Sequence, residues 1–225
     1  MPKETSRMPA ASAPLTILLT GFGPFPGARF NPTGALVEHL ARMQRPALAG
    51  TKRIARVFPT SYAVLDTDFP ELLKKHRPDV VLMFGLASRT PHLRVETVAR
   101  NIFSACLPDV TGKRPARTQL ARGKATALRN PAPTMRVLQA ARTARVPAAM
   151  SRDAGRYLCN ALYWCALDAR AEPDGPRVAV FIHVPAVRRQ AAPRARMRRR
   201  RVSATDLRRA GEAILLTVIA AARRR

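Results

Sequence analysis

The stretch LTILLTGF, residues 15–22, is followed by a turn-rich segment and then by NPTGALVEHLARM, residues 31–43. The first stretch is apolar, contains β-branched residues and ends in glycines and prolines, which is typical of a buried central strand. In the second stretch, Asn31 is suited to cap a helix and Pro32 to occupy its first turn. A buried strand followed directly by a helix indicates an α/β sheet protein.

Strands and helices continue to alternate along the rest of the chain. Apolar or alternating runs predict further strands at residues 53–60, 79–86, 93–101, 146–151 and 177–185. Helical spacing predicts helices at residues 61–76 with a break at Pro70, at 132–144, from 158 onward and at 204–222. Polar, breaker-rich sequence predicts a long loop over residues 108–131. The pattern predicts a single-domain three-layer α/β/α sandwich with a mostly parallel, mixed sheet.

Length and composition favour one globular domain. The chain has 225 residues, of which 47% are hydrophobic. We expect the domain to span residues 15–225, after a loose leader at 1–14 and with a basic loop at about 186–203. The three cysteines form no pattern typical of a disulfide framework or a zinc site, so no metal and no cofactor is expected. No apolar run is long enough for a membrane span, and a cytoplasmic location is the default expectation.

The charge of the chain is strongly positive. Forty Lys and Arg against fourteen Asp and Glu give a net charge of +26. The densest basic block is VRRQAAPRARMRRRR, residues 187–201. Such a block attracts nucleic acid and other anions without selecting among them, and it is usually a solvated loop. No aromatic residues alternate with these arginines, so an unspecific basic surface is favoured over a single-strand-binding site.

The segment DAGRYLCNALYWC, residues 153–165, carries two of the three cysteines on one predicted helix. Cys165 shares helical spacing with Leu158 and Leu162, which indicates a core residue. Cys159 lies off that stripe, in the first turn, where the positive end of the helix favours a thiolate. At this point Cys159 is either a nucleophile or another small buried residue.

A nucleophilic cysteine needs a base and a group that orients the base. His183 ends a very apolar strand, at the edge of the sheet where catalytic groups gather, although such a histidine is often a core residue. Glu96 lies in the strand-like stretch LRVETVARN. Its alternative role is an ion pair with Arg94 or Arg100.

Four segments resemble successive blocks of the pyroglutamyl peptidase I family, also called pyrrolidone-carboxylate peptidases. They are LLTGFGPFPGARFNP, GLASRTPHLRVETVARN, SRDAGRYLCN and FIHVP, which occur in the family's order over roughly residues 15–185. The resemblance implies that Cys159 is the nucleophile, His183 the base and Glu96 the carboxylate that orients the histidine.

The resemblance also implies a substrate site in the segment GFGPFPG and its surroundings. It implies that Phe22 and Phe25 flank the lactam ring of pyroglutamate and that Asn31 holds the loop that carries them. A neutral lactam suits a pocket with aromatic faces, main-chain donors and no charge. Without the resemblance, packing of both phenylalanines into the core is an equal alternative.

The chain departs from the family at some positions, while the three catalytic positions match. Bacterial members often have glutamine at the place of Leu86 and arginine at the place of Cys106. The family's members are commonly homo-oligomers, so the resemblance implies an oligomer here. The family resemblance does not explain the basic block.

The predicted function is a cysteine exopeptidase that removes N-terminal pyroglutamate from peptides through a thioester. One alternative is a catalytically weakened member that binds nucleic acid or anionic surfaces through its basic residues. A third is another cysteine hydrolase on the same scaffold, acting on a different small cyclic amide or acyl group.

Overall fold

The computed structural model describes residues 13–25, 27–187 and 201–224 of the chain. Most of the predicted leader, residues 1–14, and most of the predicted basic loop, residues 186–203, lie outside these ranges. The helices are α1 (Pro32–Arg42), η1 (Pro46–Leu48), η2 (Val64–Asp68), α2 (Phe69–His76), α3 (Thr134–Thr143), α4 (Leu158–Ala169) and α5 (Ala204–Arg223). The strands are β1 (Leu15–Phe22), β2 (Thr51–Phe58), β3 (Val80–Leu86), β4 (Leu93–Glu96), β5 (Val98–Arg100), β6 (Ala127–Arg129), β7 (Ala148–Ser151) and β8 (Val178–Val184).

One mixed sheet forms the centre of the described fold. Its strand order is β2-β1-β3-β8-β4-β7. β2, β1, β3 and β8 are parallel to one another, whereas β4 is antiparallel to β8 and parallel to β7. The strands at the centre, such as β3 and β8, are buried almost throughout because helices cover both faces.

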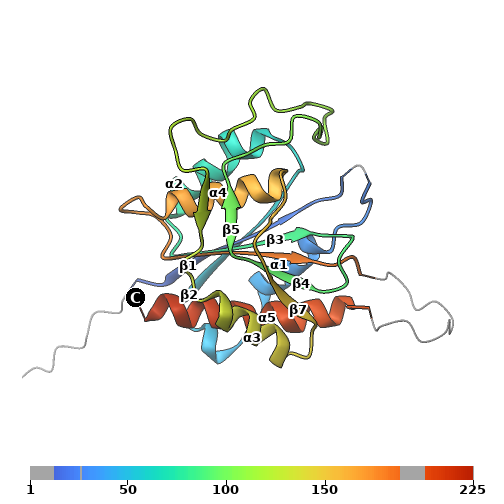
Figure 1. The fold of residues 1–225 in the computed structure, drawn as a ribbon. Coiled ribbons are helices and arrows are strands. Elements are labelled where there is room, and N and C mark those ends of the chain that lie inside the picture. The colour runs from blue at the N-terminus through green and yellow to red at the C-terminus, as the bar shows by residue number, and fades with distance from the viewer. Residues whose placement is uncertain (1–12, 26, 188–200, 225) are drawn as a thin grey trace, which may run out of the picture.

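Two helical layers enclose this sheet (Figure 1). One apolar core lies between the sheet and α1, α3 and α5, and the other lies between the sheet and α2 and α4. The capped start of α1 follows the sequence-based expectation. The break or kink expected at Pro70 is instead a change from the π-helix η2 to α2 just before this residue, and Pro70 lies in the first turn of α2. The predicted three-layer α/β/α sandwich is confirmed.

The helix α4 is buried on nearly every side rather than along one stripe. Its buried residues include Leu158, Asn160, Ala161, Leu162, Tyr163, Trp164, Ala166 and Leu167. The loop after β5 covers the side of α4 that faces away from the sheet, so the stripe predicted from spacing is too narrow. Cys165, predicted to lie in the core, is only half-buried and packs against the edge of that core.

We expect Cys165→Ala to lower the free energy of unfolding by about 1 kcal/mol, because it leaves a small cavity at the edge of the core. Urea denaturation of the variant and the wild type measures this difference. Cys106→Ala provides the matched control, because Cys106 is exposed, and it should change stability by less than about 0.5 kcal/mol. A larger loss in the control than in Cys165→Ala would contradict the expectation.

The prediction of a single strand at residues 93–101 is wrong in its continuity, because the structure divides this segment into β4 and β5. At Thr97 the chain leaves the main sheet, with its amide and hydroxyl both bonded to the Ser151 carbonyl at 2.8 Å. β5 then pairs with β6 in a separate two-stranded ribbon. The buried Asn160 of α4 holds this ribbon, accepting from the Arg100 amide and donating to the Arg100 carbonyl, both at 2.8 Å. The division therefore depends on tertiary contacts that local sequence does not show.

The long loop between β5 and β6 is organised around Asp109. This carboxylate is 2% exposed and accepts hydrogen bonds of 2.6–3.1 Å from the Ser61 hydroxyl, the Tyr62 amide, the Thr111 amide and hydroxyl, and the Lys113 amide. Burial alone would raise the pKa of Asp109, but these bonds, led by that of the Thr111 hydroxyl, lower it to about 2. The loop is thereby joined to the segment that follows β2.

Asp109→Asn should lower the free energy of unfolding at pH 7 by about 2 kcal/mol. Because the folded pKa of about 2 lies below the ordinary value of 3.8, the stabilisation is present above pH 3.8 and is lost as pH falls through 2. The deficit of the variant should therefore shrink over that interval. Urea denaturation across the pH series measures it. Asp174→Asn, at an exposed ion pair with Arg77, should show little deficit at any pH, and a pH-independent deficit for Asp109→Asn would contradict the assignment.

Candidate active site

The predicted site residues gather at the edge of the sheet where its central parallel strands end. Phe22 is the last residue of β1, Leu86 is the last of β3, and His183 is next to the last of β8. In open α/β sheets, ligands bind beyond the carboxyl ends of the strands. The edge that these three strands form is therefore the place to look for a site.

Cys159 reaches this edge from the first turn of α4, as predicted. Its sulfur packs against Gly85 of β3, since a Cβ atom built on that glycine would lie 2.8 Å from Sγ. Gly85 is also the register partner of His183 on β8. Neighbouring strands are about 4.8 Å apart, and register partners point to the same face of a sheet. The absence of a side chain at Gly85 thus lets the thiol approach the sheet beside the imidazole.

His183 and Glu96 form a buried hydrogen-bonded pair. His183 Nδ1 lies 2.8 Å from Glu96 Oε1, and the two residues are 6% and 0% exposed. The register explains the meeting: Arg94 of β4 is opposite His183, and Glu96, two residues farther along, points to the same face. A carboxylate can only accept, so Nδ1 carries a proton, and in the neutral imidazole Nε2 is then the proton acceptor.

Arg94 binds the same carboxylate oxygen. Its guanidinium lies 2.9 Å from Glu96 Oε1, and it also donates to the Ser151 hydroxyl at 2.8 Å and to the Asp153 carbonyl. The two roles that the sequence left open for Glu96, a partner of histidine and an ion pair with Arg94, therefore occur together. Asp153 belongs to the turn between β7 and α4, so Arg94 connects the carboxylate to the segment that carries Cys159.

The electrostatics of the thiol differ from the sequence-based expectation. Burial, followed by the negative charge of Glu96, raises the pKa of the Cys159 thiol to about 12. The expectation of a thiolate favoured by the helix terminus is therefore wrong for the structure at rest, because burial against Gly85 and the nearby carboxylate dominate. The thiol needs a base to remove its proton when it reacts.

A small pocket of about 60 Å³ opens beside the thiol. It is lined by Phe22, Phe25, Asn31, Thr60, Leu86, Tyr157, Leu158 and Cys159. The structure thus brings the three residues predicted to bind substrate together with the predicted nucleophile. Its walls are mainly aromatic and aliphatic, and none of its lining side chains is ionised at neutral pH. Such a lining suits a small neutral ring.

Asn31 holds the aromatic loop in place. Its Nδ2 donates to the Gly23 carbonyl at 3.1 Å, while its Oδ1 accepts from the Thr33 amide at 3.1 Å as the cap of α1. One side chain thus joins the start of the helix to the turn between Phe22 and Phe25. This geometry agrees with the loop-holding role that the resemblance implies.

Sequence reasoning missed Thr60, Tyr157 and Leu158 as lining residues. Thr60 is 4% exposed, and its hydroxyl has no hydrogen-bond partner among the residues that the structure describes. It follows the carboxyl end of β2, so the rule about strand ends would have identified it. Of the two departures from the family, Leu86 lines the pocket, whereas Cys106 is exposed and does not.

Neither a metal cluster nor a membrane span appears in the described ranges. No group of three or more His, Cys, Asp or Glu side chains within them is arranged to hold a metal ion. Their helices are also too short or too polar to cross a bilayer.

Residues 15–223 match the sequence model of the family described as pyroglutamyl peptidase. The chain belongs to the pyroglutamyl peptidase family. A pyrrolidone-carboxylate peptidase from Thermococcus onnurineus (strain NA1) is 33% identical over 177 residues, which cover 79% of this chain and 86% of that relative. One from Bacillus amyloliquefaciens is 32% identical over 175 residues, or 77% and 80% of the two chains.

Solved structures of the pyroglutamyl peptidase family share the fold. The pyroglutamyl peptidase I of Bacillus amyloliquefaciens superimposes with a TM-score of 0.75 at 28% identity, covering 92% of this chain and 97% of that one. The pyrrolidone carboxyl peptidase of Fervidobacterium islandicum AW-1 gives a TM-score of 0.81 at 25% identity, with 92% and 99% covered. The predicted family and its class, a cysteine-type omega peptidase, are confirmed. The catalytic and binding roles of individual residues remain predictions.

Proposed function

We propose that this enzyme releases N-terminal pyroglutamate from peptides, with Cys159 as nucleophile, His183 as acid and base, and Glu96 as the group that orients the imidazole. The observation that carries the proposal is the small uncharged pocket that joins Cys159 to Phe22, Phe25 and Asn31. The buried hydrogen bond between His183 and Glu96 is the second support.

The pocket chemistry suits pyroglutamate better than an ordinary amino terminus. A pyroglutamyl residue has no ammonium group, so its site needs hydrogen-bonding groups rather than a carboxylate. Among the described residues, the pocket offers the Thr60 hydroxyl, which has no hydrogen-bond partner, as a group that can bind the lactam. An ammonium group would find no lining carboxylate there and would lose its hydration without compensation.

In the first half of the reaction, the thiol has to lose its proton as it attacks. Because the resting pKa of Cys159 is about 12, we propose that Nε2 of His183 takes the proton while Sγ attacks the pyroglutamyl carbonyl carbon. Glu96 stabilises the imidazolium that forms. The first main-chain amides of α4, which have no partner within the helix, are the natural donors to the oxyanion. The imidazolium then protonates the departing amine, leaving a thioester on Cys159.

In the second half, water enters and the thioester is hydrolysed. The same Nε2 accepts a proton from the water as it attacks the thioester carbonyl. The tetrahedral intermediate collapses, free pyroglutamate leaves, and the proton returns to the Cys159 sulfur. Since a thiol nucleophile works only while it is reduced, we also propose that the enzyme acts in the cytoplasm, where thiols are kept reduced.

The direct test is release of a fluorophore from a pyroglutamyl amide by the purified protein. We expect hydrolysis of this amide and none of the corresponding prolyl and alanyl amides, whose basic nitrogens suit the pocket poorly. Activity on none of the three would reject the proposal and favour a binding protein. Activity on the alanyl amide in preference would instead indicate a different hydrolase.

A further inference from the structure

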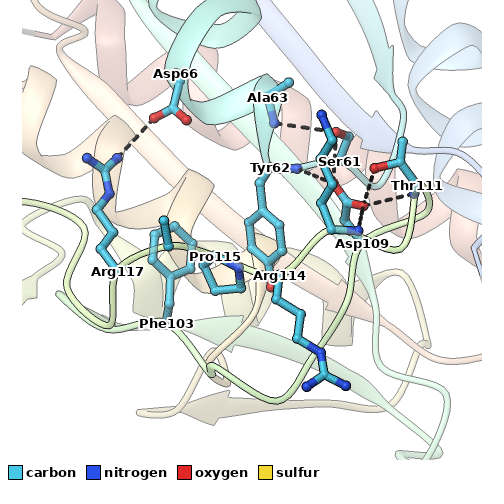
Figure 2. Close-up of a pocket in the computed structure, with 12 residues that line it drawn as sticks. Ser61, Tyr62, Ala63, Asp66, Phe103, Asp109, Thr111, Arg114, Pro115 and Arg117 are labelled. Carbon is cyan, nitrogen blue, oxygen red and sulfur yellow. Dashed lines mark hydrogen bonds and ion pairs between the residues drawn. The ribbon is translucent and has the colours of Figure 1, made fainter.

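A second, larger pocket lies directly beside the one that contains Cys159. It has a volume of about 570 Å³ and includes Ser61, Tyr62, Phe103, Arg114, Pro115 and Arg117 among its lining residues (Figure 2). We call it the basic pocket. Its size falls in the range of sites that hold a peptide fragment or a drug-sized ligand.

The two pockets share a wall. Thr60 lines the Cys159 pocket, and the next two residues, Ser61 and Tyr62, line the basic pocket. The Tyr62 ring also packs edge-on against the ring of Tyr157, which lines the Cys159 pocket, with centroids 5.8 Å apart. Two residues of extended peptide span about 7 Å, so the first residues after a pyroglutamyl group at Cys159 would reach the basic pocket.

The wall between the pockets is held firmly. Tyr62 and Tyr157 donate their hydroxyl protons to the adjacent carbonyls of Leu107 and Pro108, at 2.7 and 2.9 Å. The hydrogen bonds to Asp109 fix the next part of the same loop. A peptide would therefore meet a preformed surface, which reduces the entropy lost on binding.

The lining of the basic pocket carries a net positive formal charge, since Lys113, Arg114 and Arg117 stand against two carboxylates, those of Asp66 and Asp109. Asp109 accepts hydrogen bonds from its own loop and from the residues after β2, and Asp66 pairs with Arg117 at 2.9 Å. Lys113 and Arg114, both exposed, have no ion-pair partner among the described residues. Figure 2 shows the Arg114 guanidinium extending beyond the Tyr62 ring, on the side away from Arg117. Two free cations thus border an aromatic floor formed by Tyr62 and Phe103.

We propose, on the basis of the function proposed above, that the basic pocket binds the peptide that follows pyroglutamate and favours a carboxylate side chain in its first two residues. The peptide backbone lies over the Tyr62 and Phe103 rings, and the carboxylate meets Lys113 and Arg114. Charged hydrogen bonds of this kind discriminate between a carboxylate and a neutral amide of the same shape. Acidic pyroglutamyl peptides are therefore the preferred substrates.

The test compares two peptides that differ only in charge, pyroglutamyl-glutamyl-alanine amide and pyroglutamyl-glutaminyl-alanine amide. The wild type should give a kcat/KM ratio of about five or more in favour of the glutamyl peptide. The double variant Lys113→Gln/Arg114→Gln should bring this ratio close to one. Assays at about 0.15 M salt confine electrostatic attraction to about 8 Å, which limits the contribution of distant charges.

Two control variants distinguish the effect of the basic pocket on substrate preference from the effect of the chain's overall positive charge. Arg136→Gln/Arg208→Gln removes the same charge from exposed positions on α3 and α5, beyond the opposite face of the sheet, and should keep the wild-type ratio. Lys113→Arg/Arg114→Lys preserves the charge and should keep it as well. An equal fall in the ratio for both neutralised pairs would overturn the proposal, since overall charge would then explain the preference.

The outcome for the small fluorogenic amide distinguishes this proposal from the function on which it rests. A wild type that hydrolyses the amide but treats the two peptides alike would overturn the basic pocket as a selective site and leave the peptidase function intact. A wild type that hydrolyses neither the amide nor the peptides would reject the function and this proposal with it.

Discussion

Cys159→Ala should abolish hydrolysis of pyroglutamyl amides while leaving the fold intact. Alanine has no atom that can form a thioester, and His183 and Glu96 cannot replace a nucleophile. The substitution removes only the sulfur that packs against Gly85, so circular dichroism and the urea midpoint should stay close to the wild type. Steady-state and single-turnover assays with the fluorogenic amide measure the loss.

The other two cysteines serve as matched controls for this experiment. Cys165→Ala and Cys106→Ala remove the same atom from the edge of the core and from an exposed loop, and both should keep near-normal turnover. Substrate should also protect one thiol, that of Cys159, from alkylation. A Cys159→Ala protein with near wild-type turnover would contradict the assignment of the nucleophile.

The layered fold could be predicted from the sequence because its central strands are long and apolar and are separated by helices with clear start and stop signals. β1 and α1 show this most clearly, with the turn cluster before Asn31 and the cap that Asn31 provides. Local pattern and tertiary structure agree here, since a strand covered on both faces must be apolar throughout. The same agreement holds for β8, where His183 is the one strongly polar residue.

The segments that local sequence did not explain are those fixed by distant side chains. The division of this segment into β4 and β5 at Thr97 requires the Ser151 carbonyl and the side-chain amide group of Asn160. The loop around Asp109 requires Ser61 and the Tyr62 amide, which lie 48 and 47 residues away in the chain. Neither contact produces a periodic pattern of residues in the sequence, and both lie in segments next to the candidate site.

The site itself was predictable in composition but not in electrostatics. Motif resemblance supplied Cys159, His183 and Glu96, and β-strand parity explains why Glu96 meets the histidine once the pairing of β4 with β8 is known. The high pKa of the thiol depends on burial and on the distance to a carboxylate on another strand. Gly85 begins one of the four segments that resemble the family, but nothing in the sequence shows that its missing side chain makes room for the sulfur.

The remaining large effect concerns the pair that is proposed to move the proton. His183→Ala should lower kcat by about 10⁴-fold, at the upper end of what a general acid and base contributes, because the thiol is neutral at rest and the imidazole is the base proposed to deprotonate it. Glu96→Gln should lower kcat by about 10²- to 10³-fold. Glutamine can still accept a hydrogen bond from Nδ1, but it no longer balances the charge of the imidazolium.

Because of Arg94, Glu96→Gln should lower kcat by more than the loss of one charged hydrogen bond would. In the wild type its guanidinium and the imidazole share one carboxylate oxygen, at 2.9 and 2.8 Å. Once that carboxylate is neutral, the guanidinium remains beside the ring and opposes its protonation. Glu96→Asp keeps the negative charge on a shorter side chain, so it should recover part of the lost turnover.

The double variant Glu96→Gln/His183→Ala decides whether the two residues act as one unit. With the imidazole gone, the carboxylate has nothing to orient, so the double variant should be about as slow as His183→Ala alone. Measurement of kcat for all four proteins of this cycle, with thermal unfolding to confirm that each is folded, gives the coupling directly. The opposite result would be a double variant whose kcat is lower than that of His183→Ala by the full factor lost in Glu96→Gln. Such multiplicative losses would mean that Glu96 has an independent structural role through its ion pair with Arg94.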